Sequence, residues 1–163
     1  MSVEKVNYYE DFNEIEKKLW SLLERAVSDR NSEFRTPVFI CGDKNNLDGR
    51  VVVLRKADSK NNLVQFHSDI RSTKIRVIEN NSNCSLLFYG KKEKIQLRMK
   101  VDAEIHHKDE ISESSWKKTG HMSRKCYLVS NPPGTLSSVP TSGLNEKFDK
   151  FDFSMEESEK GYE

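Results

Sequence analysis

Hydrophobic residues change their spacing about 30 residues into the chain. Over residues 8–30 they recur every three or four positions, as in Phe12, Ile15 and Leu19, with charged residues between them. This is the period of an amphipathic α-helix with one buried face. Over residues 36–105, β-branched and aromatic residues instead gather in short runs between polar turns, which is typical of strands. The pattern therefore predicts one helix followed by a β-rich region.

The β-rich region contains five runs that predict strands. Most of the links between them are short, and this favours antiparallel hairpins, because parallel neighbours need a crossover of about a dozen residues or more. The one long link contains Ser72, a suitable N-cap, followed by a helical pattern over residues 73–79. We expect a mainly β fold with flanking helices, arranged as a closed or partly closed antiparallel barrel. The predicted strands are residues 36–42, 50–55, 63–68, 84–89 and 95–105.

The last third of the chain is less regular. Residues 109–119 predict a helix, acidic at its start and basic at its end, as the helix dipole favours. Residues 131–143 are rich in Pro, Gly and Ser and predict a loop. Residues 145–163 hold seven acids and three lysines, a net charge of −4 against +1 for the whole chain. The remaining residues are therefore only mildly basic, which argues against a nucleic-acid partner.

Composition predicts one polar domain spanning residues 1–163. Hydrophobic residues make up 35% and charged residues 33%, with a mean hydropathy of −0.77. No apolar run approaches the roughly 18 residues of a membrane span, and the first residues lack the apolar core of a secretory signal. Three scattered cysteines, Cys41, Cys84 and Cys126, fit a reducing compartment. We expect a cytoplasmic protein without a membrane partner.

Standard catalytic motifs are absent from the sequence. His106 and His107 are adjacent, so in a strand they would face opposite sides and could not share a metal ion. Cys41 and Cys84 lie in apolar runs and are interpreted as small core residues. We therefore predict no metal site and assign no catalytic residue.

Basic and hydroxyl residues gather near the start of the predicted 73–79 helix. Arg71, Ser72, Thr73 and Lys74 are consecutive, and a helix N-terminus with hydroxyls and cations suits a phosphate. The same residues would also suit a capped surface helix with a solvated basic rim. Spacing alone leaves both interpretations open.

Two arginines bracket the second predicted strand. Arg50 and Arg55 are five positions apart, so on a flat strand they face opposite sides and only one meets a given ligand. A bulge or a strong twist would relax this restriction.

Three segments together resemble the pyridoxamine 5′-phosphate oxidase-like family of FMN-binding split-barrel proteins. They are RVVVLRKAD from residue 50, LVQFHSDIRSTKIRVIENNSNCSLLFYG from residue 63 and IQLRMKVDAEI from residue 95. The chain is most similar to the FMN-binding subgroup related to the oxidase. The resemblance covers residues 36–105 and continues more loosely through 123–135. It implies an antiparallel split β-barrel, formed by residues 36–105 between the 8–30 helix and the helix and loops of 106–163.

The resemblance also implies a cofactor site and an assembly. Arg50 and Lys74 would hold the FMN phosphate, while the backbone of residues 50–54 would run beside the flavin ring. Arg55 stands where the oxidase has a lysine that meets the substrate phosphate, and Gln96 matches a glutamine that contacts flavin. The family forms homodimers in which each of two FMN sites is lined by both subunits. The full implied set is Arg50, Val51, Val52, Val53, Leu54, Arg55, His67, Ser68, Ser72, Thr73, Lys74 and Gln96.

Some positions depart from the family pattern. The oxidase's substrate-binding Tyr, Arg and Ser have no counterpart, and Cys126 stands where an arginine is expected, which argues against pyridoxamine phosphate as the substrate. Val101 replaces a glycine. The sequence ends at Glu163, before the family's closing C-terminal strand, so we expect a barrel without that strand.

Three functions follow from these observations. The leading hypothesis is an FMN-dependent redox enzyme acting on an unidentified small molecule. The alternatives are a non-catalytic carrier of flavin or haem, and an interaction barrel that has lost its cofactor.

Overall fold

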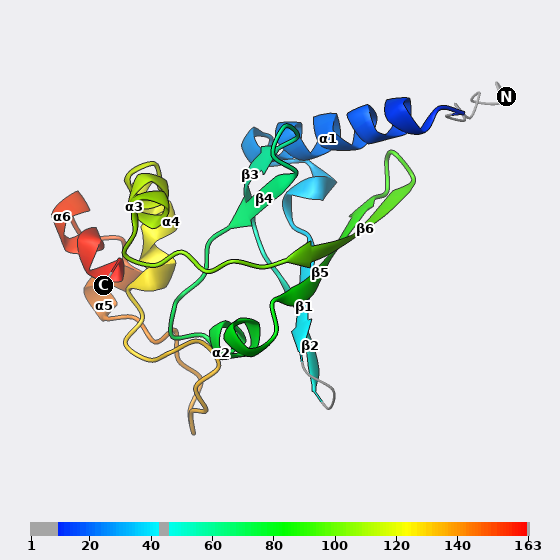
Figure 1. Ribbon diagram of the computed structural model, residues 1–163. Coiled ribbons are helices and arrows are strands. Elements are labelled where there is room, and N and C mark those ends of the chain that lie inside the picture. The colour runs from blue at the N-terminus through cyan, green and yellow to red at the C-terminus, as the bar shows by residue number, and fades with distance from the viewer. Residues whose placement is uncertain (1–9, 43–45, 163) are drawn as a thin grey trace, which may run out of the picture. The chain divides into compact units, whose positions relative to one another are not determined.

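The computed structural model describes residues 10–42 and 46–162 (Figure 1). The described chain divides into two compact units. Unit 1 runs to His67 and includes Asn83–Asp102, whereas unit 2 combines Ser68–Ser82 with the chain from Ala103 onward. Two residues of the predicted 8–30 helix and the final Glu163 lie outside the described residues.

The predicted N-terminal helix is confirmed as α1 (Phe12–Ser28) in unit 1. Asp11 caps it, since its carboxylate accepts a hydrogen bond from the Asn13 amide at 2.7 Å. Leu22, Leu23 and Ala26 are buried on one face, as the three- and four-residue spacing requires. The helix contacts β3 (Leu54–Asp58), so its apolar stripe supplies part of the unit 1 core.

Four antiparallel strands form the main sheet of unit 1 (Figure 1). Alternation separates an inner face, where Phe39, Leu86 and Phe88 are 1–2% exposed, from an outer face that carries Val51 and Tyr89. A second sheet pairs β3 with β4 (Leu63–Phe66). The order of the main sheet is β2 (Leu47–Val51), β1 (Val38–Gly42), β5 (Asn83–Gly90) and β6 (Ile95–Asp102).

The prediction of one strand over residues 50–55 is wrong. Val52 and Val53 separate β2 from β3, and the two strands belong to different sheets. The Val52 amide donates to the carbonyl of Pro37 at 3.0 Å, after which the chain leaves the first sheet to pair with β4. The register also shifts between Leu54 and Lys56, which is the bulge at Arg55. The five-residue spacing of Arg50 and Arg55 therefore says nothing about which sides they face.

Of the other four predicted strands, three are confirmed with shorter ends, and the one predicted over 84–89 is one residue longer at each end. The first begins at Val38, because Pro37 has no amide proton for a ladder. The third ends at Phe66 and the fifth at Asp102 rather than residue 105. The strands of the described part form two open sheets, and no closed barrel is found among them.

Unit 2 consists of short helices and loops. The helix predicted after Ser72 is α2, and the acidic helix predicted at 109–119 is α3, which begins after the N-cap Asp109. The predicted loop over 131–143 is confirmed. Its helices are α2 (Thr73–Asn80), α3 (Glu110–Lys117), α4 (His121–Arg124), α5 (Glu146–Asp149) and α6 (Met155–Ser158).

A buried arginine joins three segments of unit 2. Arg124 is 2% exposed and donates to the carbonyl oxygens of Thr119 at 2.9 Å and Trp116 at 3.0 Å. It also pairs with the Glu159 carboxylate, which accepts a hydrogen bond from the Trp116 indole at 2.7 Å. Because Arg124 and Trp116 both contact Glu159, this cluster connects the acidic C-terminal segment to α3 and α4.

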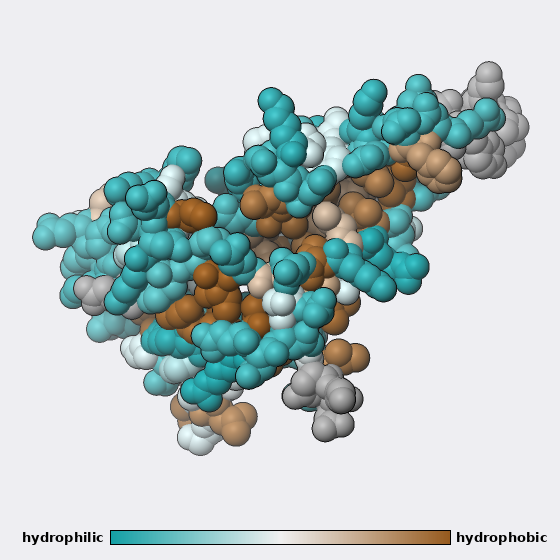
Figure 2. Space-filling model, viewed as in Figure 1, coloured by the Kyte–Doolittle hydropathy of each residue, from teal (hydrophilic) through white to brown (hydrophobic). Residues whose placement is uncertain are grey.

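The visible surface is mostly hydrophilic, with smaller groups of hydrophobic residues showing between the hydrophilic ones (Figure 2). Among the described helices, none combines the length and apolar character needed to cross a bilayer.

Candidate functional site

Arg50 lies on β2 with an unsatisfied buried donor. It sits opposite Phe39 on the inner side of the main sheet, and its side chain is 24% exposed. The guanidinium pairs with Asp48, yet its Nε is buried and has no hydrogen-bond partner in the described part of the chain. A buried donor without an acceptor costs about 1–3 kcal/mol. An anionic oxygen, such as one from a phosphate, is the acceptor that this donor suits best.

Arg55 and His67 are neighbours in unit 1. Arg55 occupies the bulge of β3, and His67 follows the end of β4. The Nε of Arg55 is also buried without a partner among the described residues. Burial lowers the pKa of His67, and the positive charge of Arg55 lowers it further. The imidazole is therefore neutral at pH 7, where it can accept or donate a hydrogen bond without adding charge beside Arg55.

The segment between the two arginines leaves the strand ladders. Val51 is 65% exposed, whereas Val52 and Leu54 are 7% and 2% exposed. Val53 is half-buried and lies outside both sheets. The side chains of this segment are thus divided between core and surface. Its backbone passes from one sheet to the other, and this is the segment that the family resemblance assigns to the flavin ring.

Gln96 lies on the opposite face of the main sheet from Arg50. It belongs to β6, where it is paired with Tyr89 of β5, and its side chain is exposed. Arg50 shares the inner side with Phe39 and Leu86. The structure therefore does not bring Arg50 and Gln96 of one chain together.

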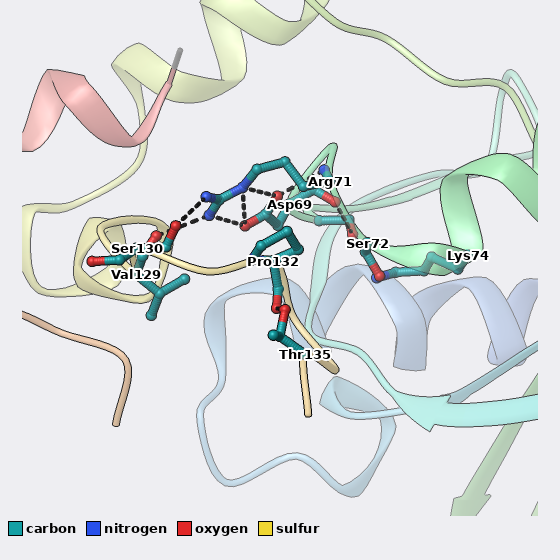
Figure 3. A network of polar contacts seen from close by, with 9 residues as sticks. Asp69, Arg71, Ser72, Lys74, Val129, Ser130, Pro132 and Thr135 are labelled. Carbon is teal, nitrogen blue, oxygen red and sulfur yellow. Dashed lines mark hydrogen bonds and ion pairs between the residues drawn. The ribbon is translucent and has the colours of Figure 1, made fainter. Parts of the chain in front are cut away.

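The unit 2 members of the predicted set lie at and before the start of α2. Ser72 and Lys74 are 3% and 8% exposed, and the Lys74 ammonium donates to the Ser72 hydroxyl at 2.8 Å (Figure 3). Thr73 is exposed, and the Ser68 hydroxyl donates to the carbonyl of Asp69 at 3.2 Å. Ser72 holds the predicted N-cap position, but its side chain makes no capping bond. Its hydroxyl is oriented by Lys74 instead.

Arg71 has a structural role that sequence reasoning missed. Its guanidinium binds Asp69 with Nε at 3.0 Å, and also donates to the carbonyls of Val129 at 3.0 Å and Ser130 at 3.2 Å (Figure 3). Burial alone would raise the pKa of Asp69, but the hydrogen bonds and charge of Arg71 outweigh it and the pKa is lowered. Arg71 is thus engaged in fixing the turn before α2. The Asp-x-Arg spacing hinted at the ion pair, whereas the carbonyl partners are too distant in sequence to be found.

Arginine donors near strand ends and a buried lysine where a helix begins are groups that suit the phosphate of a cofactor. Residues 17–107 match the family described as pyridoxamine 5′-phosphate oxidase, FMN-binding domain. The match spans more than half of the chain, so the protein belongs to this family, and FMN is its cofactor.

Solved structures show the same fold. A pyridoxamine 5′-phosphate oxidase-related FMN-binding protein from Nostoc punctiforme superposes with a TM-score of 0.62 at 18% identity, covering 88% of this chain and 72% of that one. PhzG from Burkholderia lata, in complex with tetrahydrophenazine-1-carboxylic acid, gives a TM-score of 0.59 at 14% identity, covering 85% and 67%. A comparison with curated proteins returned no match. The resemblance and the cofactor predicted from the sequence are confirmed, whereas the residues of the site remain predictions.

Proposed function

We propose that this protein binds FMN and uses it as a redox enzyme acting on a small molecule. The observation that carries the proposal is the buried Nε of Arg50, which lacks an acceptor among the described residues. Such a donor is costly unless a ligand supplies an anionic oxygen. We assign this role to FMN, the cofactor of the family.

Each predicted residue has chemistry that suits one part of the cofactor. The family resemblance assigns Arg50 and Lys74 to the phosphate, for which their positive charges are suited, and assigns Ser68, Ser72 and Thr73 to it as hydroxyl donors. The backbone of Val51, Val52, Val53 and Leu54 is assigned to the flavin ring. Arg55, His67 and Gln96 are assigned to the ring or to the substrate beside it.

The redox chemistry itself belongs to FMN, which when bound accepts and returns two electrons. The chain binds and orients it and sets the charge around it. Arg55 places a positive charge in this region. The neutral His67 offers a hydrogen bond without adding a second positive charge. No catalytic acid or base is needed among the described residues for this role.

Substitution of the cations tests the assignment. Arg50→Met and Lys74→Met should each weaken FMN binding about tenfold or more, because a charge-assisted hydrogen bond contributes about 1.5–3 kcal/mol. Lys60→Met, at an exposed turn lysine, is the matched control and should bind FMN like the wild type. Circular dichroism checks that each variant is folded. Unchanged affinity in both folded variants would remove Arg50 and Lys74 from the site.

The redox role is tested separately on FMN-loaded protein. We expect NADH or NADPH to bleach the long-wavelength flavin absorption band without oxygen, and air to restore it. A protein that retains FMN but shows neither reaction with any tested donor would favour the carrier instead.

We further propose that the protein is a cytoplasmic homodimer. The outer face of the main sheet supports the dimer. Leu47, Val51 and Tyr89 share this face and are 77%, 65% and 59% exposed. Gln96 lies on the same face. Since Arg50 faces the other side, we assign Gln96 to the FMN site of a second copy that covers this face.

A further inference from the structure

Two cysteines of unit 1 occupy facing positions on neighbouring strands. The β1–β5 register pairs Val38 with Leu87, Phe39 with Leu86 and Ile40 with Ser85. Continuing this antiparallel register by one residue, within the bounds of both strands, puts Cys41 opposite Cys84. Both are thiols, 2% and 4% exposed. The sequence did not predict this pairing, because the two residues are far apart in it and each alone is explained as a small core residue.

Facing positions on antiparallel strands lie within reach of a disulfide. Directly opposed residues in an antiparallel pair have Cα atoms about 4.5–5.5 Å apart, within the range of about 4.4–6.8 Å found for disulfides. The alternation that places Phe39 and Leu86 on the inner face places both cysteines there as well. Burial raises the pKa of Cys84, and the neighbouring Cys41 raises it further, so the reactive thiolate forms during local opening, when water reaches the sulfur.

We propose that Cys41 and Cys84 form a reversible disulfide that locks β1 to β5 when the protein is oxidised. Hydrogen peroxide is the oxidant, because a small neutral molecule can reach a buried thiol during local opening whereas a bulky disulfide cannot.

The reaction balances in two steps. One thiolate attacks a peroxide oxygen, the O–O bond breaks, and a sulfenic acid and one water form. The second thiol then attacks the sulfenic sulfur, the S–O bond breaks, the S–S bond forms, and a second water leaves. The two sulfurs lose two electrons, the peroxide is reduced, and the thiol protons end in water. A thiol reductant reverses the change.

The neighbourhood of this pair connects it to the proposed cofactor residue. On its other side, Cys41 pairs with Asp48, the carboxylate that holds Arg50. The disulfide would thus fix the strand that aligns this ion pair. The crosslink is read out directly as a peptide pair, so a failure of this proposal is distinguishable from a failure of the proposed function.

Peptide mapping of the folded full chain tests the proposal. The Cys126→Ser variant removes the exposed thiol and is treated with hydrogen peroxide, unfolded in the presence of an alkylating agent, digested and analysed by mass spectrometry. We expect one crosslinked peptide pair containing Cys41 and Cys84, which is lost on treatment with dithiothreitol. Cys41→Ser and Cys84→Ser, each combined with Cys126→Ser, are the controls that cannot form it.

Thermal unfolding gives a second readout. The disulfide closes a loop of roughly 40 residues and should raise the Tm of the oxidised Cys126→Ser protein by about 5–15 °C. Dithiothreitol should return it to the starting value. Recovery of both thiols as alkylated peptides after peroxide treatment, with Tm unchanged, would overturn the proposal.

Discussion

At the scale of single residues, Arg55 and His67 show how position determines protonation. His67 is held neutral first by burial and then by the neighbouring guanidinium. The family resemblance placed both residues in the candidate set, whereas the bulge at Arg55 is seen only in the paired register of β3 and β4. Because the bulge is a property of the paired strands, neither residue type predicts it alone.

The pKa of His67 can be followed by NMR titration. We expect a midpoint below its ordinary value of 6.5, and a higher midpoint in Arg55→Gln that still stays below 6.5, because burial remains. Lys60→Gln, remote from this pair in the exposed turn, should leave it unchanged. A midpoint at or above 6.5 in the wild type would contradict the described burial of the ring.

The same shift affects stability in a defined direction. The folded state holds the pKa below that of the unfolded chain, so the unfolded chain binds protons more readily as the pH falls. The stabilisation from the neutral ring is complete above pH 6.5 and is lost as the pH falls through the lower folded pKa.

At the scale of elements, helices with local signals were predictable and long-range breaks were not. The stripe of α1 and the acidic start of α3 lie within a few residues of sequence, and both helices are confirmed. The break at Val52 depends on the carbonyl of Pro37, and a Val-Val-Val run carries uniform strand propensity. The pairing of Cys41 with Cys84 likewise requires the register of two strands that are distant in sequence.

The N-cap of α3 gives a prediction at this scale. Asp109 accepts a hydrogen bond from the Ser112 amide at 2.8 Å and contacts His106 Nδ1 at 2.8 Å. The Ser112 amide and the His106 ring lower the pKa of Asp109 to about 2. Asp109→Ala should lower Tm at pH 6 by roughly a few degrees, since a helix cap is lost.

Acid should remove this difference. The pKa of Asp109 is depressed in the folded state, so its stabilisation is present above its unfolded value of 3.8 and is lost as the pH falls through about 2. Thermal scans of both proteins across this range measure the effect. A Tm difference that persists undiminished at pH 2 would show that the carboxylate is not its source.

At the scale of the whole molecule, family membership and the FMN cofactor follow from the match over residues 17–107. Motif order along the sequence was sufficient to predict both, because the family pattern is carried by consecutive strands. The role of each site residue was harder to predict from the sequence. Arg50 and Gln96 belong to the same predicted set but face opposite sides of one sheet, and the proposed dimer would place them in two different FMN sites.

The proposed dimer is tested on the outer face of the main sheet. Tyr89→Lys should shift the protein from dimer toward monomer in light scattering coupled to size exclusion, because it places a charge in an apolar interface. Leu63→Lys changes a residue that is 40% exposed on the other sheet and should leave the dimer intact. A wild-type protein that is monomeric at all concentrations would exclude this assembly.

The most direct measurement of the central claim is an absorption spectrum of the purified full chain after addition of FMN and removal of unbound ligand, with mass spectrometry of the cofactor released on denaturation. We predict a yellow protein that retains close to one FMN per chain. A folded protein that stays colourless and releases no FMN would contradict the account.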